Sequence, residues 1–575
     1  MLKFLTSTRF LYFYAVLAIA LPNVALCLTE HMPLLACAAN VVLPVAVYAL
    51  LMALSAKVGR QVWCVFLLIF FAAFQMVLLY LYGRSVIAVD MFLNLVTTNP
   101  GEAMELLDNL VPAVAGVVVV YVPLLVLASV SWARHARERE AFLGRARRVS
   151  LWAAAAGLAL VASAYVAYPR GADFEYRAED HVYPVNVFYN LCLAARESYR
   201  TQHYANAVAH YRFGARSAHE ADSAEVYVLV VGETARADNF QLYGYGRPTN
   251  PLLSQDSGLC VFRHALSQSN TTHKSVPMLL SAASATGHDR LYRERGIVAA
   301  FREAGFHTAF FSNQLPNHSF IDFFGEEAHD FVFVRNEAES GAADGDVAAL
   351  TSDDRLLPYL RRALDAGHRK LFVVLHTYGS HFNYRDRYAQ RYARFMPDTP
   401  TEAEAKNRPQ LINAYDNTIL QTDRLLHSVI AMLRERGCAA AMLYTSDHGE
   451  NIFDDSRRRF LHASPVPSAY GIHVPLMVWT SEQYRRQYPD AVRGMESNRL
   501  KGVETSASVF PTMLSLAGIS SPRVADVMPL SLADGRYKAP RRRHYLDDHN
   551  RAVTLRQVGM VPQDFEALAK WGISE

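Results

Sequence analysis

The apolar residues of this 575-residue chain are concentrated before about residue 168, and this uneven distribution constrains the fold more than any other feature. Five apolar runs there are long enough to cross about 30 Å of hydrocarbon as helices. They are Phe10–Leu28, Pro33–Ser55, Val62–Tyr82, Val111–Val130 and Leu151–Tyr168. The first run could be a signal peptide, but it lacks a convincing small-residue cleavage site and four more runs follow, so we expect it to be retained. The sequence therefore predicts a transmembrane domain over residues 1–168.

Basic residues in the loops predict which way these spans cross the membrane. Lys57 and Arg60 lie between the second and third runs, and six arginines from Arg134 to Arg148 lie between the fourth and fifth. The first link has no Lys or Arg, and the link between the third and fourth runs has Arg84 alone. By the positive-inside rule the N-terminus is cytoplasmic, and after five spans the rest of the chain lies outside the cytoplasm.

The link between the third and fourth runs, about residues 85–110, is amphipathic and polar enough to lie in the outer membrane interface. Asn94, Thr98 and Glu102 recur in it at a spacing of four, which places them on one face of a helix. Pro100 also allows a helix–turn–helix. From spacing alone, a solvated helix face is the preferred interpretation.

The remainder of the chain divides into a connector and a second domain. Residues 169–220 are charged and aromatic, and they contain one amphipathic helical pattern. From 221 to 575, strand-like and helix-like segments alternate, which favours a mostly parallel sheet with helices on both faces. The predicted strands are Val226–Val231, 307–313, 370–376, 439–445 and 473–479, and the predicted helices include Gly296–Ala304 and Leu420–Arg436, the latter ended by Gly437.

Three of the predicted strands are followed by side chains that bind metals. Glu233 follows the first, His381 comes shortly after the strand at 370–376, and Asp447 and His448 follow the strand at 439–445, with His462 further on. Ligands bind beyond the carboxyl ends of the strands in open α/β sheets. Oxygen and imidazole ligands suit Zn²⁺, and Mn²⁺ is the alternative. A lone histidine is more often a core or surface residue, but an acid and an imidazole together at a strand end favour function.

Candidate nucleophiles lie in SQSNTTHKSVPMLLS, residues 267–281, just before an apolar helical segment. A hydroxyl at a helix N-terminus gains from the positive end of the dipole, and Zn²⁺ coordination would lower its pKa. Ser269, Thr271 or Thr272 could instead cap the helix. Their spacing does not choose among them.

Charge and cysteine content exclude some classes of protein. The net charge of +3 is too small to indicate a nucleic-acid partner. The six cysteines show neither zinc-ligand spacing nor a disulfide framework. Those in or beside the apolar runs (Cys27, Cys37 and Cys64) are expected to be small buried hydrophobes. A pair among Cys192, Cys260 and Cys438 could oxidise outside the cytoplasm.

Taken together, several motifs resemble the phosphoethanolamine transferases of Gram-negative inner membranes, which belong to the alkaline-phosphatase/sulfatase superfamily. In chain order they are GETARADNFQLYGYGRPTNP, SNTTHKSVP, LHTYGSH, YDNTILQTDRLL and SDHGEN, behind five spans. The resemblance covers nearly the whole chain. It implies a bacterial inner-membrane protein with a cytoplasmic N-terminus and a periplasmic α/β catalytic domain of the alkaline-phosphatase/sulfatase type over residues 221–575. Met278 and Leu279 stand where the lipid A enzymes have a cysteine, so this chain is nearer the disulfide-poor branches of the family.

The resemblance also implies roles for individual residues. Thr272 matches the nucleophile and, with Glu233, Asp447 and His448, the ligands of one tightly bound Zn²⁺. His381 and His462 match histidines that bind the phosphoryl group or a second zinc. Asn94, Thr98 and Glu102 match interfacial-loop residues implicated in substrate binding, which replaces the solvated-face interpretation. Lys274 and Asn313 are weaker candidates for contacts to the phosphoryl oxygens.

The implied reaction is the transfer of phosphoethanolamine from phosphatidylethanolamine to lipopolysaccharide core, lipid A or another envelope glycan, through a covalent intermediate on Thr272. The enzyme is expected to be a monomer that contacts membrane lipids and no nucleic acid. The alternatives are a phosphoglycerol transferase of the same superfamily, which typically uses Mn²⁺, and a catalytically silent membrane scaffold. A sulfatase would need a Cys- or Ser-x-Pro-x-Arg motif, which the sequence lacks.

Overall fold

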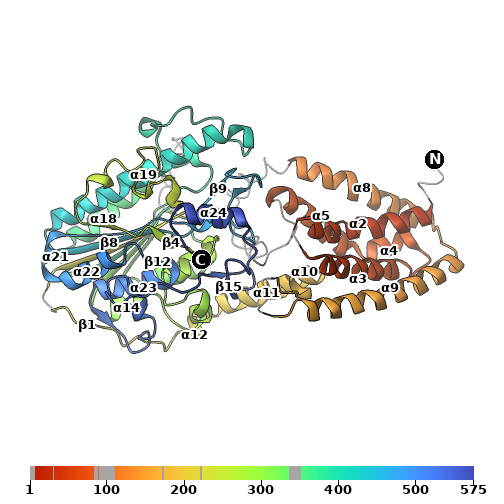
Figure 1. The fold of residues 1–575 in the computed structure, drawn as a ribbon, viewed down its shortest axis with the longest axis horizontal. Helices are drawn as coiled ribbons and strands as arrows, with labels where there is room; N and C mark the ends of the chain where they lie inside the picture. The colour runs from red at the N-terminus through yellow and green to blue at the C-terminus, as the bar shows by residue number, and fades with distance from the viewer. Residues whose placement is uncertain are drawn as a thin grey trace. The chain divides into compact units, whose positions relative to one another are not determined.

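The computed structural model describes residues 7–29, 32–82, 89, 111–170, 174–220, 223–335 and 351–574. The chain forms two compact units, Met1–Arg196 and Glu197–Glu575, and the division falls within helix α11 (Val185–Gln202). Figure 1 shows that the first unit is helical and that the second contains a sheet flanked by helices. Asn94, Thr98 and Glu102, in the interfacial segment expected near residues 85–110, lie outside the described residues.

Long apolar helices form the first unit. Four of the described helices are long and apolar enough to cross a membrane: α2 (Thr8–Thr29), α3 (Leu34–Met52), α8 (Val111–Ala133) and α9 (Glu140–Ala167). A fifth span is present only if α4 (Val58–Cys64) and α5 (Phe66–Tyr82), which are bent by 64° relative to each other, count as one. The predicted third span, Val62–Tyr82, therefore lies mostly in α5, and a bend near Val65 interrupts its start. α4 carries Arg60 and Gln61, and such polar residues favour the membrane boundary over its interior.

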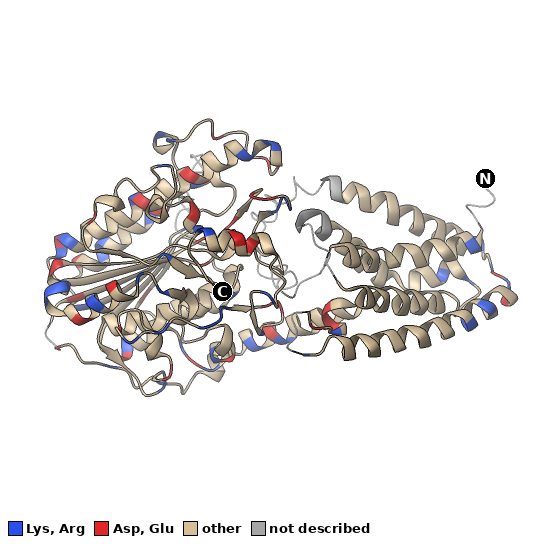
Figure 2. Ribbon diagram, viewed as in Figure 1, with Lys and Arg blue, Asp and Glu red and all other residues tan. Residues whose placement is uncertain are grey.

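The two ends of this bundle differ in composition. Figure 2 shows Lys and Arg gathered where α8 leads into α9. Glu138, in that connection, accepts hydrogen bonds from Thr8 Oγ1 (2.7 Å) and Arg9 Nε (3.2 Å). The start of α2 therefore lies at the same basic end of the bundle as the start of α9.

A seven-stranded sheet forms the centre of the second unit (Figure 1). Its order is β3-β11-β8-β2-β7-β5-β6. The strands from β8 to β6 run parallel to one another, and β11 runs antiparallel to β8, so the sheet is mostly parallel, as predicted. The strands are β2 (Glu225–Gly232), β3 (Leu259–Val261), β5 (His307–Ser312), β6 (Asp330–Phe333), β7 (Lys370–His376), β8 (Ala439–Ser446) and β11 (Leu476–Thr480).

Both faces of this sheet are buried, because alternate residues of β2 enter different cores. Val226, Val228 and Val230 pack on one face with helices α18 (Leu357–Asp365) and α19 (Arg408–Arg436). Tyr227, Leu229 and Val231 pack on the other face. Helices α13 (Thr272–Leu279), α14 (Ile297–Glu303), α15 (Phe320–Gly325) and α23 (Thr505–Leu516) contribute to that second core. A strand covered on both faces reads as a continuous apolar run, which is the pattern seen in the sequence.

Two boundaries differ from the sequence-based expectations. Helix α19 begins at Arg408 rather than Leu420, with Pro409 in its first turn, and it ends at Gly437 (φ +65°) as predicted. The first half of α19 buries Asp416, Asn417 and Thr418, so its buried face is partly polar. The sequence there lacks the helical spacing of apolar residues that would predict a helix. β11 begins after Pro475, which cannot donate to a sheet hydrogen bond, rather than at His473.

His376, the last residue of β7, should make the second unit sensitive to acid. Its Nδ1 hydrogen-bonds Ser312 Oγ (3.1 Å), and burial lowers its pKa to about 4. The pKa of a histidine in an unfolded chain is near 6.5. Between pH 6.5 and pH 4 the unfolded chain therefore binds more protons than the folded one. The stability that is present above pH 6.5 is lost as the pH falls to about 4. At pH 5 this loss is about 2 kcal/mol.

We therefore expect His376→Gln to reduce the drop in melting temperature between pH 7.5 and pH 5, measured on the detergent-purified protein. The exposed His210 provides a control, because His210→Gln should keep the full wild-type drop. An unchanged drop in His376→Gln would contradict the assignment.

Candidate metal and nucleophile site

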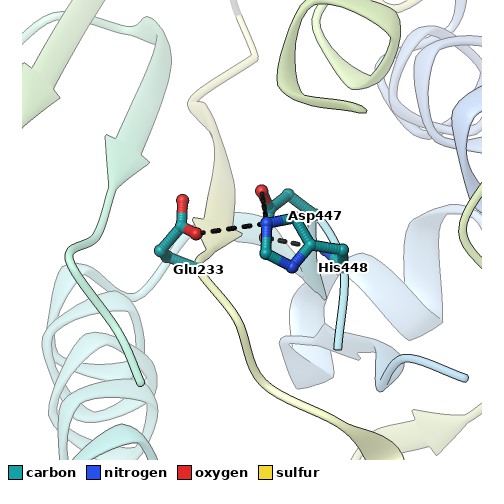
Figure 3. Close-up of side chains that lie close together, drawn as sticks. All are labelled: Glu233, Asp447 and His448. Carbon is teal, nitrogen blue, oxygen red and sulfur yellow. Dashed lines mark hydrogen bonds and ion pairs between the residues drawn. The ribbon is translucent and has the colours of Figure 1, made fainter. Parts of the chain in front are cut away.

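The register of two neighbouring strands brings a pair of acids together. β2 and β8 pair so that Gly232 lies opposite Ser446. The residue that follows each of these strands is an acid: Glu233 follows β2 and Asp447 follows β8. His448 follows Asp447, and Figure 3 shows the three side chains converging. The carboxyl edge of the sheet, where α/β proteins bind ligands, thus carries all three groups.

Thr272, the first residue of α13, presents its hydroxyl to this cluster. Its Oγ1 lies 3.2 Å from Glu233 Oε1 and 3.2 Å from His448 Nε2. His448 Nε2 is also 3.4 Å from Glu233 Oε1 and 3.3 Å from Asp447 Oδ2. Thr271 occupies the N-cap position of the helix without a side-chain capping bond, and its Oγ1 contacts Ser269 Oγ instead (3.1 Å). Of the hydroxyls left open by the sequence, Thr272 is therefore the one that contacts the cluster.

Neighbouring groups hold the three side chains in place. His448 Nδ1 lies 2.9 Å from the carbonyl oxygen of Gly449, which can only accept, so Nδ1 carries a proton and Nε2 faces the cluster. Glu233 accepts hydrogen bonds from Thr234 Oγ1 (2.7 Å) and Gln314 Nε2 (3.1 Å). Asp447 Oδ1 accepts the backbone N–H groups of Thr234 (3.0 Å) and His448 (2.7 Å). Such outer contacts orient metal ligands in known sites.

The donor set of Glu233, Asp447 and His448 fits a divalent cation. At most 1% of the surface of Glu233 or Asp447 is exposed, and His448 is fully buried. Burial raises the pKa of Asp447. Burial alone would lower the pKa of His448, but Asp447 and Glu233 raise it above its ordinary value. The ligand atoms lie within 4.8 Å of one another, and two buried carboxylates with one imidazole are ligands that Zn²⁺ accepts.

His381 and His462 lie beside this cluster. The ring of His462 is 4.2 Å from that of His448 and 5.8 Å from that of His381, centre to centre. Removal from solvent lowers the pKa of both His381 and His462 to about 3, so both rings are neutral at physiological pH. They can therefore offer hydrogen bonds or lone pairs, but no positive charge, to a group bound next to Thr272.

Sequence reasoning missed Glu450, the last acid of SDHGE. Its Oε1 is 3.4 Å from His462 Nδ1, and burial raises its pKa to about 8. The position of this carboxyl, two residues after His448, was the available signal. It was missed because the sequence pattern predicts which residues follow a strand. It does not predict the conformation of the turn after them, which brings Glu450 to His462.

Lys274 and Asn313 bind the chain itself. Lys274 Nζ donates to the carbonyl oxygen of Asp547 (3.1 Å). Asn313 Nδ2 donates to Asp353 Oδ1 (2.8 Å), and that carboxylate accepts the backbone N–H groups of Tyr378 (2.7 Å) and Gly379 (2.9 Å). The described contacts of these two residues thus hold loops around the site.

Gly379 permits a close approach that places Glu233. Its φ is +53°, and a Cβ there would lie 2.4 Å from the carbonyl oxygen of Glu233 and 2.9 Å from its backbone nitrogen. Because both atoms are backbone, neither can move without shifting Glu233. Ser380 N–H also donates to the same carbonyl (2.9 Å).

We expect Gly379→Ala to lower metal affinity by roughly 10–100-fold, the range found when groups that orient metal ligands are disturbed. Isothermal titration of the metal-free protein with Zn²⁺ measures this. Gly367→Ala is the matched control, since Gly367 has φ +78° but no atom within 4 Å of an added Cβ. If both variants bound Zn²⁺ like wild type, the close approach would not position Glu233.

The C-terminal segment holds the loops that bear the site. His462 follows the hairpin of β9 (Asn451–Ile452) and β10 (Phe460–Leu461). Arg457 in this hairpin donates two hydrogen bonds of 2.7 Å to Asp564 of helix α24 (Pro562–Lys570). The loop before Thr272 is held from the same segment, because Tyr545 Oη donates to Asn270 Oδ1 (2.7 Å).

Comparisons with known proteins agree with this architecture. The family model "Sulfatase" matches residues 225–519. The Kdo(2)-lipid A phosphoethanolamine 7''-transferase of Escherichia coli K12 is 29% identical over 303 residues, which are 51% of this chain and 52% of that protein. The chain spans about half the length of the curated relatives it matches.

Solved structures resemble both units. The integral membrane lipooligosaccharide phosphoethanolamine transferase A (EptA) of Neisseria meningitidis matches with a TM-score of 0.63 and 20% identity, over 93% of this chain and 99% of that one. The zinc complex of the C-terminal periplasmic domain of Escherichia coli EptC matches with a TM-score of 0.52 and 21% identity, over 59% of this chain and 95% of that one. These likenesses show the fold: apolar helices followed by a sulfatase-like α/β domain. The family model covers slightly more than half of the chain, including Glu233, Thr272, Asp447 and His448, and the chain therefore belongs to the sulfatase family.

Proposed function

We propose that this protein is a metal-dependent phosphoethanolamine transferase of the bacterial inner membrane. The observation that carries the proposal is the position of Thr272 Oγ1, 3.2 Å from both Glu233 Oε1 and His448 Nε2 at the carboxyl edge of the sheet. The similarity to a lipid A phosphoethanolamine transferase supports the same class of reaction. The donor would be phosphatidylethanolamine, and the acceptor a glycolipid or glycan of the cell envelope.

In the first proposed step, Thr272 Oγ1 attacks the phosphorus of phosphatidylethanolamine. A bond from Oγ1 to phosphorus forms, the bond from phosphorus to the diacylglycerol oxygen breaks, and diacylglycerol leaves once that oxygen takes up the proton that Glu233 received from Thr272. Glu233 Oε1, which accepts the Thr272 hydroxyl in the structure, receives the proton of the nucleophile. Neutral His381 and His462 would hydrogen-bond the phosphoryl oxygens.

In the second proposed step, a hydroxyl or phosphate oxygen of the acceptor attacks the same phosphorus, the bond from phosphorus to Thr272 Oγ1 breaks, and the acceptor's proton passes through Glu233 to Oγ1. A covalent nucleophile divides one difficult transfer into two easier ones. Glu233, Asp447, His448 and Thr272 Oγ1 would hold one zinc ion. When bound, zinc supplies positive charge that lowers the pKa of the hydroxyl and stabilises charge on the phosphoryl oxygens.

The charge distribution of the spans supports a periplasmic site. By the positive-inside rule, the basic residues between α8 and α9 would lie at the cytoplasmic end of the bundle. The catalytic unit follows the other end of α9 and would face the periplasm. Membrane spans keep such a site near lipid headgroups, and Asn94, Thr98 and Glu102 remain our candidates for donor contacts.

A labelling experiment tests the donor. Purified protein in vesicles is given either phosphatidylethanolamine labelled in the ethanolamine or phosphatidylglycerol labelled in its headgroup, and label on Thr272 is located by peptide mass spectrometry. We expect label from the ethanolamine lipid alone. Label from the glycerol lipid alone would make the protein a phosphoglycerol transferase, and label from neither would contradict a covalent transfer. Loss of one phosphoethanolamine unit from the envelope glycolipids of deletion cells would identify the acceptor.

Metal removal should abolish the reaction while leaving the fold intact. We expect the dialysed, chelator-treated protein to lose labelling of Thr272, and Zn²⁺ to restore it better than Mn²⁺. Asp447→Asn should not be rescued at the same zinc concentration, because a neutral amide is a poorer ligand than a carboxylate. Metal content by mass spectrometry and labelling are read on the same samples. Full labelling by metal-free protein would contradict the proposed metal site.

A further inference from the structure

Two cysteines face each other across the junction of α2 and α3. Cys27 lies in the last turn of α2 and Cys37 in the first turn of α3. Cys27 Sγ is 3.7 Å from the carbonyl oxygen of Cys37, and Cys37 Sγ is 4.0 Å from that of Cys27. These reciprocal contacts place each thiol beside the backbone of the other cysteine, which is more than burial as small hydrophobes requires.

This pair lies at the end of the bundle from which the chain continues to the catalytic unit. The start of α2 is bound to Glu138, immediately before α9, so α2 and α9 begin at the same end. Both therefore finish at the opposite end, where Cys27 is found. Asn23 and Asn40 bind Tyr183, which follows α9. Asn23 Nδ2 donates to the carbonyl oxygen of Tyr183 (2.8 Å), and the Tyr183 N–H donates to Asn40 Oδ1 (3.3 Å).

The compartment of this end follows from the proposed function. If the catalytic unit is periplasmic, the cysteine pair is at the periplasmic end of the membrane. Bacterial periplasm is an oxidising compartment in which disulfides form and persist, whereas cytoplasmic thiols stay reduced. Cys27 and Cys37 are both partly exposed, and each lies within one turn of a helix end rather than at the centre of a span.

We propose that Cys27 and Cys37 form a disulfide that closes the junction of α2 and α3 in the mature protein. One thiolate attacks the disulfide of a periplasmic protein disulfide donor and forms a mixed disulfide. The second thiolate then attacks the sulfur of the first cysteine and releases the donor as a dithiol. The chain loses two protons and two electrons, and the donor's sulfurs take up the electrons. The link joins α2 to α3 beside the asparagines that bind Tyr183.

Thiol counting on the full-length protein tests this. Cells are quenched in acid, the protein is dissolved in denaturant, and free thiols are alkylated with a maleimide polymer before and after reduction. The chain has six cysteines. We expect four to react without reductant and six after reduction. The same protein from cells that lack the periplasmic disulfide donor should show six in both samples.

Single variants identify the pair. Cys27→Ser should react at five sites with or without reductant, because Cys37 is freed, and Cys37→Ser should behave likewise. Cys64→Ser is the matched control, since Cys64 is exposed; it should give three without reductant and five after. Six reactive thiols in unreduced wild type would overturn the proposal, as would a two-thiol difference that survives Cys27→Ser.

The test of the disulfide can be distinguished from the test of the transferase reaction. Thr272→Ala should retain the disulfide while losing label transfer. Conversely, a protein with six free thiols that still carries label on Thr272 would leave the transferase proposal standing and remove the disulfide.

Discussion

Thr272→Ala should lower the rate of phosphoethanolamine transfer by roughly 10³-fold or more, the scale on which removal of a catalytic nucleophile acts. The hydroxyl is the only group of this side chain that reaches Glu233 and His448. An alanine removes both contacts and leaves no atom to carry the phosphoryl group. Thr272→Ser keeps an oxygen in place and should retain part of the activity. The measurement is transfer of labelled ethanolamine from vesicles, with label on the protein read in parallel.

The neighbouring threonine supplies the control for Thr272. Thr271 is the N-cap of the same helix, yet its side chain makes no capping bond, so Thr271→Ala should fold and transfer almost like wild type. Metal content is measured for both variants, because Thr272 is also a proposed ligand. A labelled adduct in Thr272→Ala, or its loss in Thr271→Ala alone, would move the nucleophile to another residue.

The strands of the catalytic unit could be predicted because each is a short apolar run bounded by polar residues. All five predicted strands are present, and the acids that follow β2 and β8 converge. Their convergence depends on the pairing of Gly232 with Ser446, which no local pattern contains. Local sequence patterns could therefore predict Glu233, Asp447 and His448 individually as candidate ligands. That the three side chains lie close together depends on the order of the strands in the sheet.

Contacts between segments distant in sequence could not be predicted. By spacing alone Thr272 was one of three equivalent hydroxyls; the family resemblance singled it out, and its distance to Glu233 agrees. The half of α19 that buries Asp416 and Asn417 has no apolar period, since its inward face is satisfied by hydrogen bonds such as Asn239 Nδ2 to Asp416 Oδ1 (2.6 Å). The bend between α4 and α5 likewise lies within an uninterrupted apolar run.

Asp564 is the clearest case of a residue with no sequence signal. It lies beyond residues 225–519, which the family model covers. Only 1% of it is exposed, and it accepts two hydrogen bonds from Arg457 and a longer one from Arg459 (3.5 Å). It also accepts the backbone N–H of Ala469 (3.1 Å). One carboxylate thus connects α24 with the hairpin before His462 and with the segment that follows it.

Asp564→Asn should destabilise the catalytic unit by about 1–3 kcal/mol, because charged hydrogen bonds from Arg457 are weakened while Arg457 keeps its ion pair with Asp455. Because the hairpin before His462 loses its anchor, transfer should fall in folded protein as well, measured below the melting temperature.

Asp534→Asn is the control, since its partner Arg536 is 92% exposed and a surface pair contributes about 0–1 kcal/mol. The double variant Asp564→Asn, Arg457→Gln should cost less than the sum of the two single changes, because both changes remove the same two hydrogen bonds between these side chains. Strictly additive costs would show that the pair does not hold the hairpin. A stable Asp564→Asn with normal transfer would show that His462 is positioned without α24.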